Sequence, residues 1–152
     1  MIQVYKLLDS MKDHFYANGI THKVSYGNEF DLDLDKTTLF PLVHLDIIEA
    51  NYDGPTVVFK ILVMCLDVVN VSKTPEADDE FFGGADLHDV LNTQFVVLTK
   101  FINSAMRGDL FEDNIELASP PRAEPYTNKV GNMLAGWGAE VELRLINDVS
   151  GC

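Results

Sequence analysis

Two long apolar runs, at residues 42–50 and 56–69, dominate the hydrophobic pattern of the chain. The residues between them, Asn51-Tyr52-Asp53-Gly54-Pro55, predict a bend, because glycine tolerates positive φ and proline cannot extend a hydrogen-bonded ladder. Both runs are rich in residues that favour a pleated surface, so the pattern predicts a β-hairpin. The second run is apolar on both alternating faces. We therefore expect it to be covered on both sides for most of its length and to lie at the centre of a sheet.

Apolar residues at a spacing of three and four predict two helices. The first covers residues 2–16, where Leu7, Met11 and Phe15 share one face and charged residues lie opposite. The second covers residues 87–106, and Asp86 is placed to cap its start. The stripe of the second helix that we expect to face the sheet consists of Leu87, Val90, Leu91, Phe95, Leu98, Ile102 and Ala105.

Three further segments are predicted to be extended. Residues 22–26 and 111–118 are predicted as short strands. Residues 136–146 alternate apolar positions with polar or small ones, which is typical of a strand with one solvated face. Residues 119–127 contain three prolines, so we expect an extended connection that is neither a helix nor a central strand.

Two acidic stretches stand apart from these elements. In residues 29–35, Phe30, Leu32 and Leu34 alternate with four acids, which predicts either a strand with a solvated acidic face or an extended arm laid against a neighbour. Residues 70–85 are predicted to form a long acidic loop, and such loops tend to be functional or mobile. Phe81 and Phe82 lie in this loop without a periodic role, so we expect them to dock on the core or on a partner.

The order of these elements predicts an α+β fold with a mostly antiparallel sheet and two helices against one face. No repeat, heptad pattern or linker divides the chain, so we expect residues 1–152 to form one domain. A domain of this size buries about two-thirds of its unfolded surface and needs no disulfide or metal for stability.

The net charge of −13 is the one extreme value in the composition. An acidic surface repels the phosphates of nucleic acids and anionic membranes, and the 11 basic residues are scattered singly. The start of the chain lacks the pattern of a signal peptide, and no apolar run is long enough to span a membrane. Cys65 and Cys152 have no metal-ligand spacing, which suits a reducing compartment. We expect a soluble intracellular protein, or one that is assembled inside a cell.

The candidate sites for a metal ion or a phosphate are incomplete. Residues 31–35 match the first half of a calcium loop, but Lys36 and Leu42 stand where its glycine and its bidentate glutamate belong. Gly83-Gly84 before a helix lacks the lysine and the third glycine of a phosphate-binding loop, and acids precede it. The four histidines are far apart in the sequence: His14, His22, His44 and His88. We expect His44 to be a hydrogen-bonded strand residue rather than a ligand.

The sequence also lacks an activated nucleophile. Ser25 and Ser72 have no glycine elbow beside them. Cys65 lies in a strand that we expect to be buried, where a thiol is inert. Asp67 is interpreted as a strand-end carboxylate that caps a loop. We therefore expect no catalytic, cofactor or metal site.

Short stretches in the second half of the chain resemble a known group of proteins. They are Cys65-Leu66-Asp67-Val68-Val69, Asp89-Val90-Leu91-Asn92-Thr93-Gln94, Arg107-Gly108-Asp109-Leu110, Glu124-Pro125-Tyr126 and Asn132-Met133-Leu134-Ala135-Gly136-Trp137. From about residue 40 onward, the chain resembles small proteins encoded in the virion modules of tailed bacteriophages, including crAss-like phages. The order of elements is similar to that of the tail-terminator and neck-ring proteins, and no catalytic residues define this group.

The resemblance implies a structural ring subunit, hexameric or twelve-fold, at the head-to-tail junction of a virion assembled in the host cytoplasm. The ring would join a portal or adaptor to the tail around the DNA channel, without enzymatic activity or cofactor. An acidic channel wall lets the genome slide, because it repels phosphate. Candidate channel-facing acids are Glu29, Asp31, Asp33, Asp35, Glu140 and Glu142. Candidate contacts between subunits are Phe81, Phe82, Pro120, Pro121, Pro125 and Tyr126.

Two other classes of function fit the sequence. An acidic domain without catalytic residues suits a DNA mimic or inhibitor that binds a basic partner, which predicts carboxylates spaced like phosphates on one outer face. A small enzyme or ligand-binding module whose site forms only in an oligomer predicts a pocket with perturbed ionisable groups at a subunit boundary.

Overall fold

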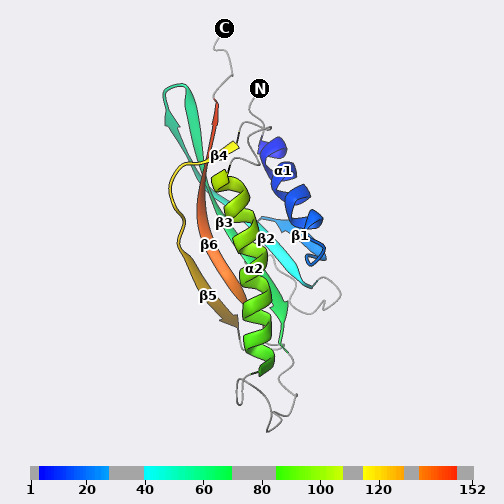
Figure 1. Cartoon of the computed structure of the whole chain (residues 1–152). Helices are drawn as coiled ribbons and strands as arrows, with labels where there is room; N and C mark the ends of the chain where they lie inside the picture. Colours follow the sequence, from blue (N-terminus) through cyan, green and yellow to red (C-terminus); the bar gives the residue numbers. More distant parts are fainter. Residues whose placement is uncertain (1–3, 28–39, 70–84, 108–114, 129–133, 147–152) are drawn as a thin grey trace.

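A six-stranded mixed sheet carries two helices on one face (Figure 1). The computed structural model describes residues 4–27, 40–69, 85–107, 115–128 and 134–146. Its elements are α1 (Val4–Ala17), β1 (Lys23–Tyr26), β2 (Leu42–Asp53), β3 (Thr56–Val68), α2 (Ala85–Arg107), β4 (Ile115–Leu117), β5 (Ala123–Asn128) and β6 (Leu134–Ile146). The strand order is β1-β2-β3-β6-β4, and β5 also pairs with β6. Only the pairing of β1 with β2 is parallel, so the predicted α+β class is confirmed.

The predicted hairpin is formed by β2 and β3, and β3 lies at the centre of the sheet as expected. Gly54 turns the chain with a φ of 58°, a conformation that glycine adopts without steric cost. The prediction that both faces of β3 are covered is wrong for most of the length of the strand. Its helix-facing residues from Val57 to Cys65 are buried, whereas on the other face only Met64 and Leu66 are buried. Both helices lie on one side, and among the described residues a small cluster around Met64 and Leu66 covers one end of the other side.

The main core lies between the sheet and the two helices. Leu7, Leu8, Met11 and Phe15 of α1 are buried there, together with Val97, Leu98, Phe101 and Ala105 of α2. The rings of Phe15 and Phe101 stack at 4.9 Å where the two helices meet. A fully buried side chain of this size contributes about 1.5–3 kcal/mol, so this face holds most of the apolar stabilisation.

The predicted stripe of α2 is correct at Val90, Leu98 and Ala105, which are buried, and wrong at Phe95. Phe95 is 44% exposed, whereas Val97, Phe101 and the polar Gln94 are buried. The helix is apolar around more than half of its circumference, and contact with β3 and β6 selects which part is covered. Phe95 instead packs beside Trp137 of β6 with ring centroids 5.1 Å apart, and the Trp137 indole N–H donates to the carbonyl of Leu91 at 2.8 Å.

Two short strands follow one another along the outer edge of β6. β4 pairs with its last third and β5 with its first half. Within the predicted strand 111–118, the structure describes 115–118, and β4 covers Ile115–Leu117. The segment 119–127 is extended as predicted, and its second half forms the edge strand β5. An edge strand tolerates Pro125, which has no N–H to donate to a second neighbour.

Candidate functional site: a groove on the helix-free face

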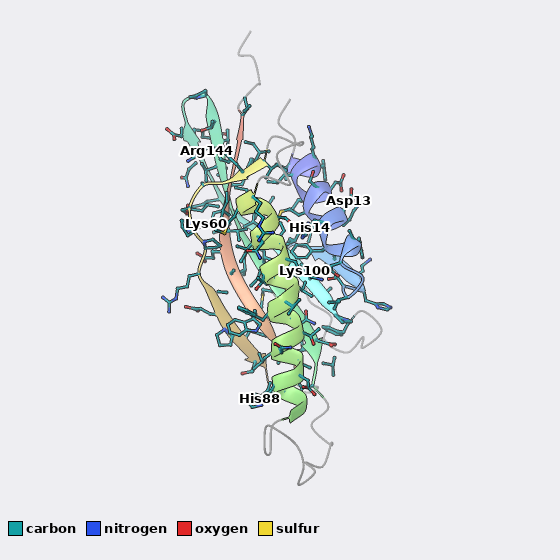
Figure 2. All side chains as sticks on the ribbon, viewed as in Figure 1. Asp13, His14, Lys60, His88, Lys100 and Arg144 are labelled. Carbon is teal, nitrogen blue, oxygen red and sulfur yellow. The ribbon has the colours of Figure 1, made fainter. Side chains whose placement is uncertain are left out.

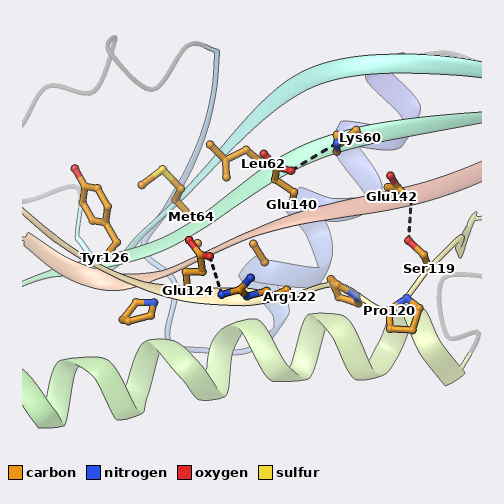
Figure 3. Close-up of a pocket in the computed structure, with 14 residues that line it drawn as sticks. Lys60, Leu62, Met64, Ser119, Pro120, Arg122, Glu124, Tyr126, Glu140 and Glu142 are labelled. Atoms are coloured by element: carbon orange, nitrogen blue, oxygen red, sulfur yellow. Dashed lines mark hydrogen bonds and ion pairs between the residues drawn. The ribbon is translucent and has the colours of Figure 1, made fainter.

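A groove of about 520 Å³ lies on the side of the sheet away from the helices, here called the helix-free face (Figure 3). Pro120 and Pro121 lie between β4 and β5 and interrupt the pairing of this edge with β6, because proline cannot contribute a ladder N–H. The connection they form, together with β5, borders the sheet along the edge of β6. The groove is lined by Lys60, Leu62, Met64, Ser119, Pro120, Pro121, Arg122, Glu124, Pro125, Tyr126, Gly138, Ala139, Glu140 and Glu142.

The register of β3 against β6 sets the floor of the groove. Lys60 pairs with Glu142, Leu62 with Glu140 and Met64 with Gly138. Since alternate side chains of a strand share a face, these residues all point away from the buried core. Gly138 has no side chain, and a Cβ built there would lie 3.8 Å from the nearest atom, in Met64. The floor is therefore apolar at the end beside Met64, which is itself buried, and charged at the Lys60 end.

The charged groups of the groove are paired with opposite or polar partners. Lys60 Nζ lies 3.7 Å from Glu140 Oε2 and 3.8 Å from Glu49 Oε1. The Ser119 hydroxyl donates to Glu142 Oε2 at 2.7 Å, and Arg122 Nη2 lies 3.4 Å from Glu124 Oε1 (Figure 3). Exposed ion pairs contribute at most about 1 kcal/mol each, so these groups remain free to exchange partners. The groove has mixed charge rather than a uniform acidic wall.

The structure brings together six residues that the sequence placed in two separate roles. Glu140 and Glu142 were predicted to face a channel, and Pro120, Pro121, Pro125 and Tyr126 were predicted to contact a neighbouring subunit. All six line this one groove. The remaining predicted residues, Glu29, Asp31, Asp33, Asp35, Phe81 and Phe82, lie outside the described residues, as does most of the acidic loop at 70–85.

Other lining residues were missed by the sequence reasoning. Lys60 is the only charged residue between Thr56 and Leu66, so its place in an apolar run was a signal that one face of β3 is open. Arg122 and Glu124 follow the two prolines without any periodic pattern. Their position depends on the pairing of β5 with β6, which has no local signature.

His44 and Ser25 form a buried polar pair. His44 is 1% exposed, its Nε2 lies 2.9 Å from the carbonyl of Gly27, and its Nδ1 lies 2.6 Å from the Ser25 hydroxyl. Because a carbonyl only accepts, Nε2 donates to it, and the Ser25 hydroxyl donates to Nδ1. The prediction of a hydrogen-bonded strand residue is confirmed. Ser25 lines neither the groove nor the hollow described below, so the pair is assigned to holding β1 on β2.

The remaining candidate groups have structural surroundings. Cys65 is buried, and burial raises the pKa of its thiol well above the ordinary value, so the predicted inertness has a physical basis. Asp67 accepts a hydrogen bond from the N–H of Val68 at 2.8 Å, at the end of β3. No three or more metal-ligating side chains cluster among the described residues. None of the described helices has the length and apolar character to span a membrane.

A second hollow, of about 420 Å³, lies between the end of α1 and the second half of α2. It is lined by His14, Ala17, Asn18, Lys100, Asn103, Ser104 and Arg107, with no carboxylate among them. His14 and Lys100 lie where the two helices face each other (Figure 2). The charged side chains that line this hollow, Lys100 and Arg107, are therefore both basic.

The sequence matches no protein-family model and no curated protein.

Proposed function

We propose that this protein is a structural subunit that assembles with copies of itself into a ring at the head-to-tail junction of a tailed-phage particle. The observation that carries the proposal is the meeting of Glu140, Glu142, Pro120, Pro121, Pro125 and Tyr126 in one groove on the helix-free face. A ring subunit needs two different surfaces that fit each other, and a groove beside an open sheet face is suited to be one of them.

The charges of the groove favour a subunit contact over a channel wall. A wall that repels DNA needs carboxylates of one sign without basic partners, whereas Lys60 and Arg122 lie within 4 Å of carboxylates here. The described residues contain 12 acidic and 8 basic side chains, a formal net charge of −4 out of the total −13. Most of the negative charge thus belongs to segments outside the described ranges. We assign Glu140 and Glu142 to the contact.

The proposal is tested by the mass and shape of the purified protein. Mass photometry over a wide range of concentrations is expected to give one closed oligomer of six or twelve copies, and negative-stain microscopy is expected to show a central hole. Quantitative mass spectrometry of purified particles should give the same copy number per virion. A protein that stays monomeric at every concentration contradicts the proposal. A salt-sensitive complex of the monomer with a basic protein would instead support the inhibitor class.

A further inference from the structure

We infer that the outer end of the β2–β3 hairpin of one copy docks in the groove of the next copy. This inference rests on the proposed function, because it names the two surfaces through which the ring would close. The hairpin tip is defined here as residues 51–55, beyond the pairing of Glu49 with the groove residue Lys60, and the groove is defined by the lining residues given above.

The hairpin tip is exposed along its whole length. Every residue from 51 to 55 is solvent-accessible, and Tyr52 is 81% exposed. Figure 1 shows the end of the hairpin extending beyond both helices. The tip is also held by the sheet, since pairing continues to Asp53 opposite Thr56, and Thr56 pairs with Ile146 of β6. A tyrosine on a paired hairpin loses little freedom on binding, which is why such residues are frequent binding anchors.

The groove offers a surface that suits such an anchor. Its volume of about 520 Å³ falls in the range of pockets that hold organic ligands, so a tyrosine side chain with its backbone fits. Leu62 and Tyr126 are partly exposed and supply apolar and aromatic contacts, as in the centre of protein interfaces, and both pack on the buried cluster that contains Met64. Pro120 and Pro121 border the groove, and their backbone conformations are restricted, so this border loses little conformational entropy on binding.

The two surfaces have complementary charge. Asp53 at the tip is exposed and makes no ion pair with any residue in the described ranges. The Arg122 side chain at the groove is 87% exposed, and its contact to Glu124 at 3.4 Å is a weak surface pair. A contact between Asp53 of one copy and Arg122 of the next would fix the register of docking.

A copy cannot place its tip in its own groove. Thr56 directly follows the tip, and Lys60, at the near end of the groove, lies roughly 13 Å further along the same strand, β3, at the rise of a β-strand. Pairing with β2 and β6 keeps this strand extended, so the tip points away from the groove of its own chain. Two different surfaces that bind each other give a head-to-tail contact, and repeated head-to-tail contacts close into rings.

Charge reversal at Asp53 and Arg122 tests the contact. The variants D53R and R122D are each expected to weaken assembly by about tenfold or more, because each places like charges together. The double variant D53R/R122D should assemble as the wild type does. A mixture of the two single variants should also assemble, with the variants alternating around the ring. Each contact then joins an arginine of D53R to an aspartate of R122D. Rescue by pairing excludes misfolding as the cause, and circular dichroism of each monomer checks it independently.

Two tyrosines of equal exposure provide a matched control. Tyr52 is 81% exposed at the tip, and Tyr5 is 80% exposed on α1. We expect Y52S to weaken assembly by about tenfold and Y5S to leave it unchanged, because only Tyr52 would be buried in the contact.

The outcomes separate this inference from the proposed function. If the wild type forms rings and the single charge variants form them equally well, the inference is overturned and the ring proposal stands. If the single variants fail and neither the double variant nor the mixture recovers, the pairing of tip and groove is also overturned. A monomeric wild type overturns both.

Discussion

At the scale of single residues, Gly136 of β6 lies so close to the backbone of β3 that no side chain fits there. A Cβ built there would lie 1.8 Å from the carbonyl oxygen of Cys65, far inside any permitted contact. The obstacle is backbone of β3, which cannot move aside as a side chain can. Gly138, two residues further along β6, has its nearest neighbour at 3.8 Å. The two glycines therefore differ sharply in what a methyl group would cost.

We expect Gly136→Ala to lower the free energy of unfolding by about 3 kcal/mol, because the added methyl forces β3 and β6 apart. Gly138→Ala is the control and should change it by less than about 1 kcal/mol. Urea titration followed by the fluorescence of Trp137, the single tryptophan, measures both. Equal losses in the two variants would contradict the close approach.

The buried Cys65 predicts a loss of stability at alkaline pH. Burial raises the pKa of its thiol in the folded state, whereas in the unfolded chain it titrates near its ordinary value of 9.0. Above that pH the unfolded state releases a proton that the folded state keeps, so unfolding becomes more favourable. Stability from this group is complete below about pH 9 and falls by up to about 1.4 kcal/mol per pH unit above it.

The measurement compares the wild type with a Cys65→Ala variant in urea titrations at several alkaline pH values. Tyrosine and lysine titrations are common to both, so the difference in slope isolates the thiol. Parallel slopes, or rapid labelling of Cys65 by a thiol reagent in the native state, would show that the thiol is accessible.

At this scale, the burial and hydrogen bonding of a residue could be predicted where they depend on its neighbours along the chain. The burial of Cys65 and the hydrogen bonding of His44 followed from apolar residues on either side. The constraint on Gly136 could not be predicted in this way, because it comes from Cys65 of β3, which lies about 70 residues earlier in the chain. No local sequence pattern shows that these two residues lie beside each other.

At the scale of elements, α2 contains a polar residue in its buried face. Gln94 is 1% exposed, and its Nε2 donates no hydrogen bond within the described part of the chain. A buried amide without a partner costs about 1–3 kcal/mol. Methionine has a similar length and no such requirement, and it is a strong helix former.

We therefore expect Gln94→Met to raise the free energy of unfolding by about 1 kcal/mol. Asn103→Met, at an exposed position of the same helix, should change it by no more than about 0.5 kcal/mol. Thermal unfolding by circular dichroism at 222 nm compares the two. A loss of stability in Gln94→Met would mean that the amide is satisfied in solution.

Helices and strands could be predicted because their hydrophobic periodicities are local. The pairing of the strands in the sheet could not be predicted from such patterns. Both helices and the hairpin were predicted close to their observed ends, and the strand at 136–146 begins two residues earlier as β6. The parallel pairing of β1 and the succession of β4 and β5 along β6 depend on tertiary contacts. The buried face of α2 was predicted in part, since an apolar excess around a helix leaves its exact rotation to be fixed by the sheet: Leu98 and Ala105 are buried as expected, whereas Phe95 is exposed.

At the scale of the whole molecule, net charge should govern assembly. Each copy carries a formal charge of −13, and one contact between Asp53 and Arg122 does not offset repulsion between whole subunits. Raising the salt concentration from about 10 mM to about 150 mM shortens the screening length from about 30 Å to about 8 Å. We expect the concentration needed for half-assembly to fall several-fold over this range.

Mass photometry at a series of sodium chloride concentrations measures this effect, with sucrose at matched osmolality as the control. Assembly that weakens as salt is added would indicate that pairs of opposite charge outweigh the repulsion between subunits.

The groove itself could not be predicted from the sequence, although six of the twelve residues chosen from the sequence for other reasons line it. Prolines and alternating acids have local signatures, so Pro120, Pro121, Pro125, Tyr126, Glu140 and Glu142 were chosen. That they share a groove with Lys60 and Met64 depends on the register of β3 against β6. A shift of one residue in that register would turn Lys60 into the core and abolish the groove.

The place of β6 in the sheet has a consequence for synthesis on the ribosome. The hairpin of β2 and β3 pairs early, but the strand that completes the sheet beside β3 is the last described element to be made. Until Ile146 has been translated, thirteen residues of β3 hold an unpaired, valine-rich edge. Neighbouring nascent chains on one messenger hold the same edge, which is a template for aggregation. Pausing of translation after residue 69 should therefore lower the yield of folded protein more than pausing before residue 42.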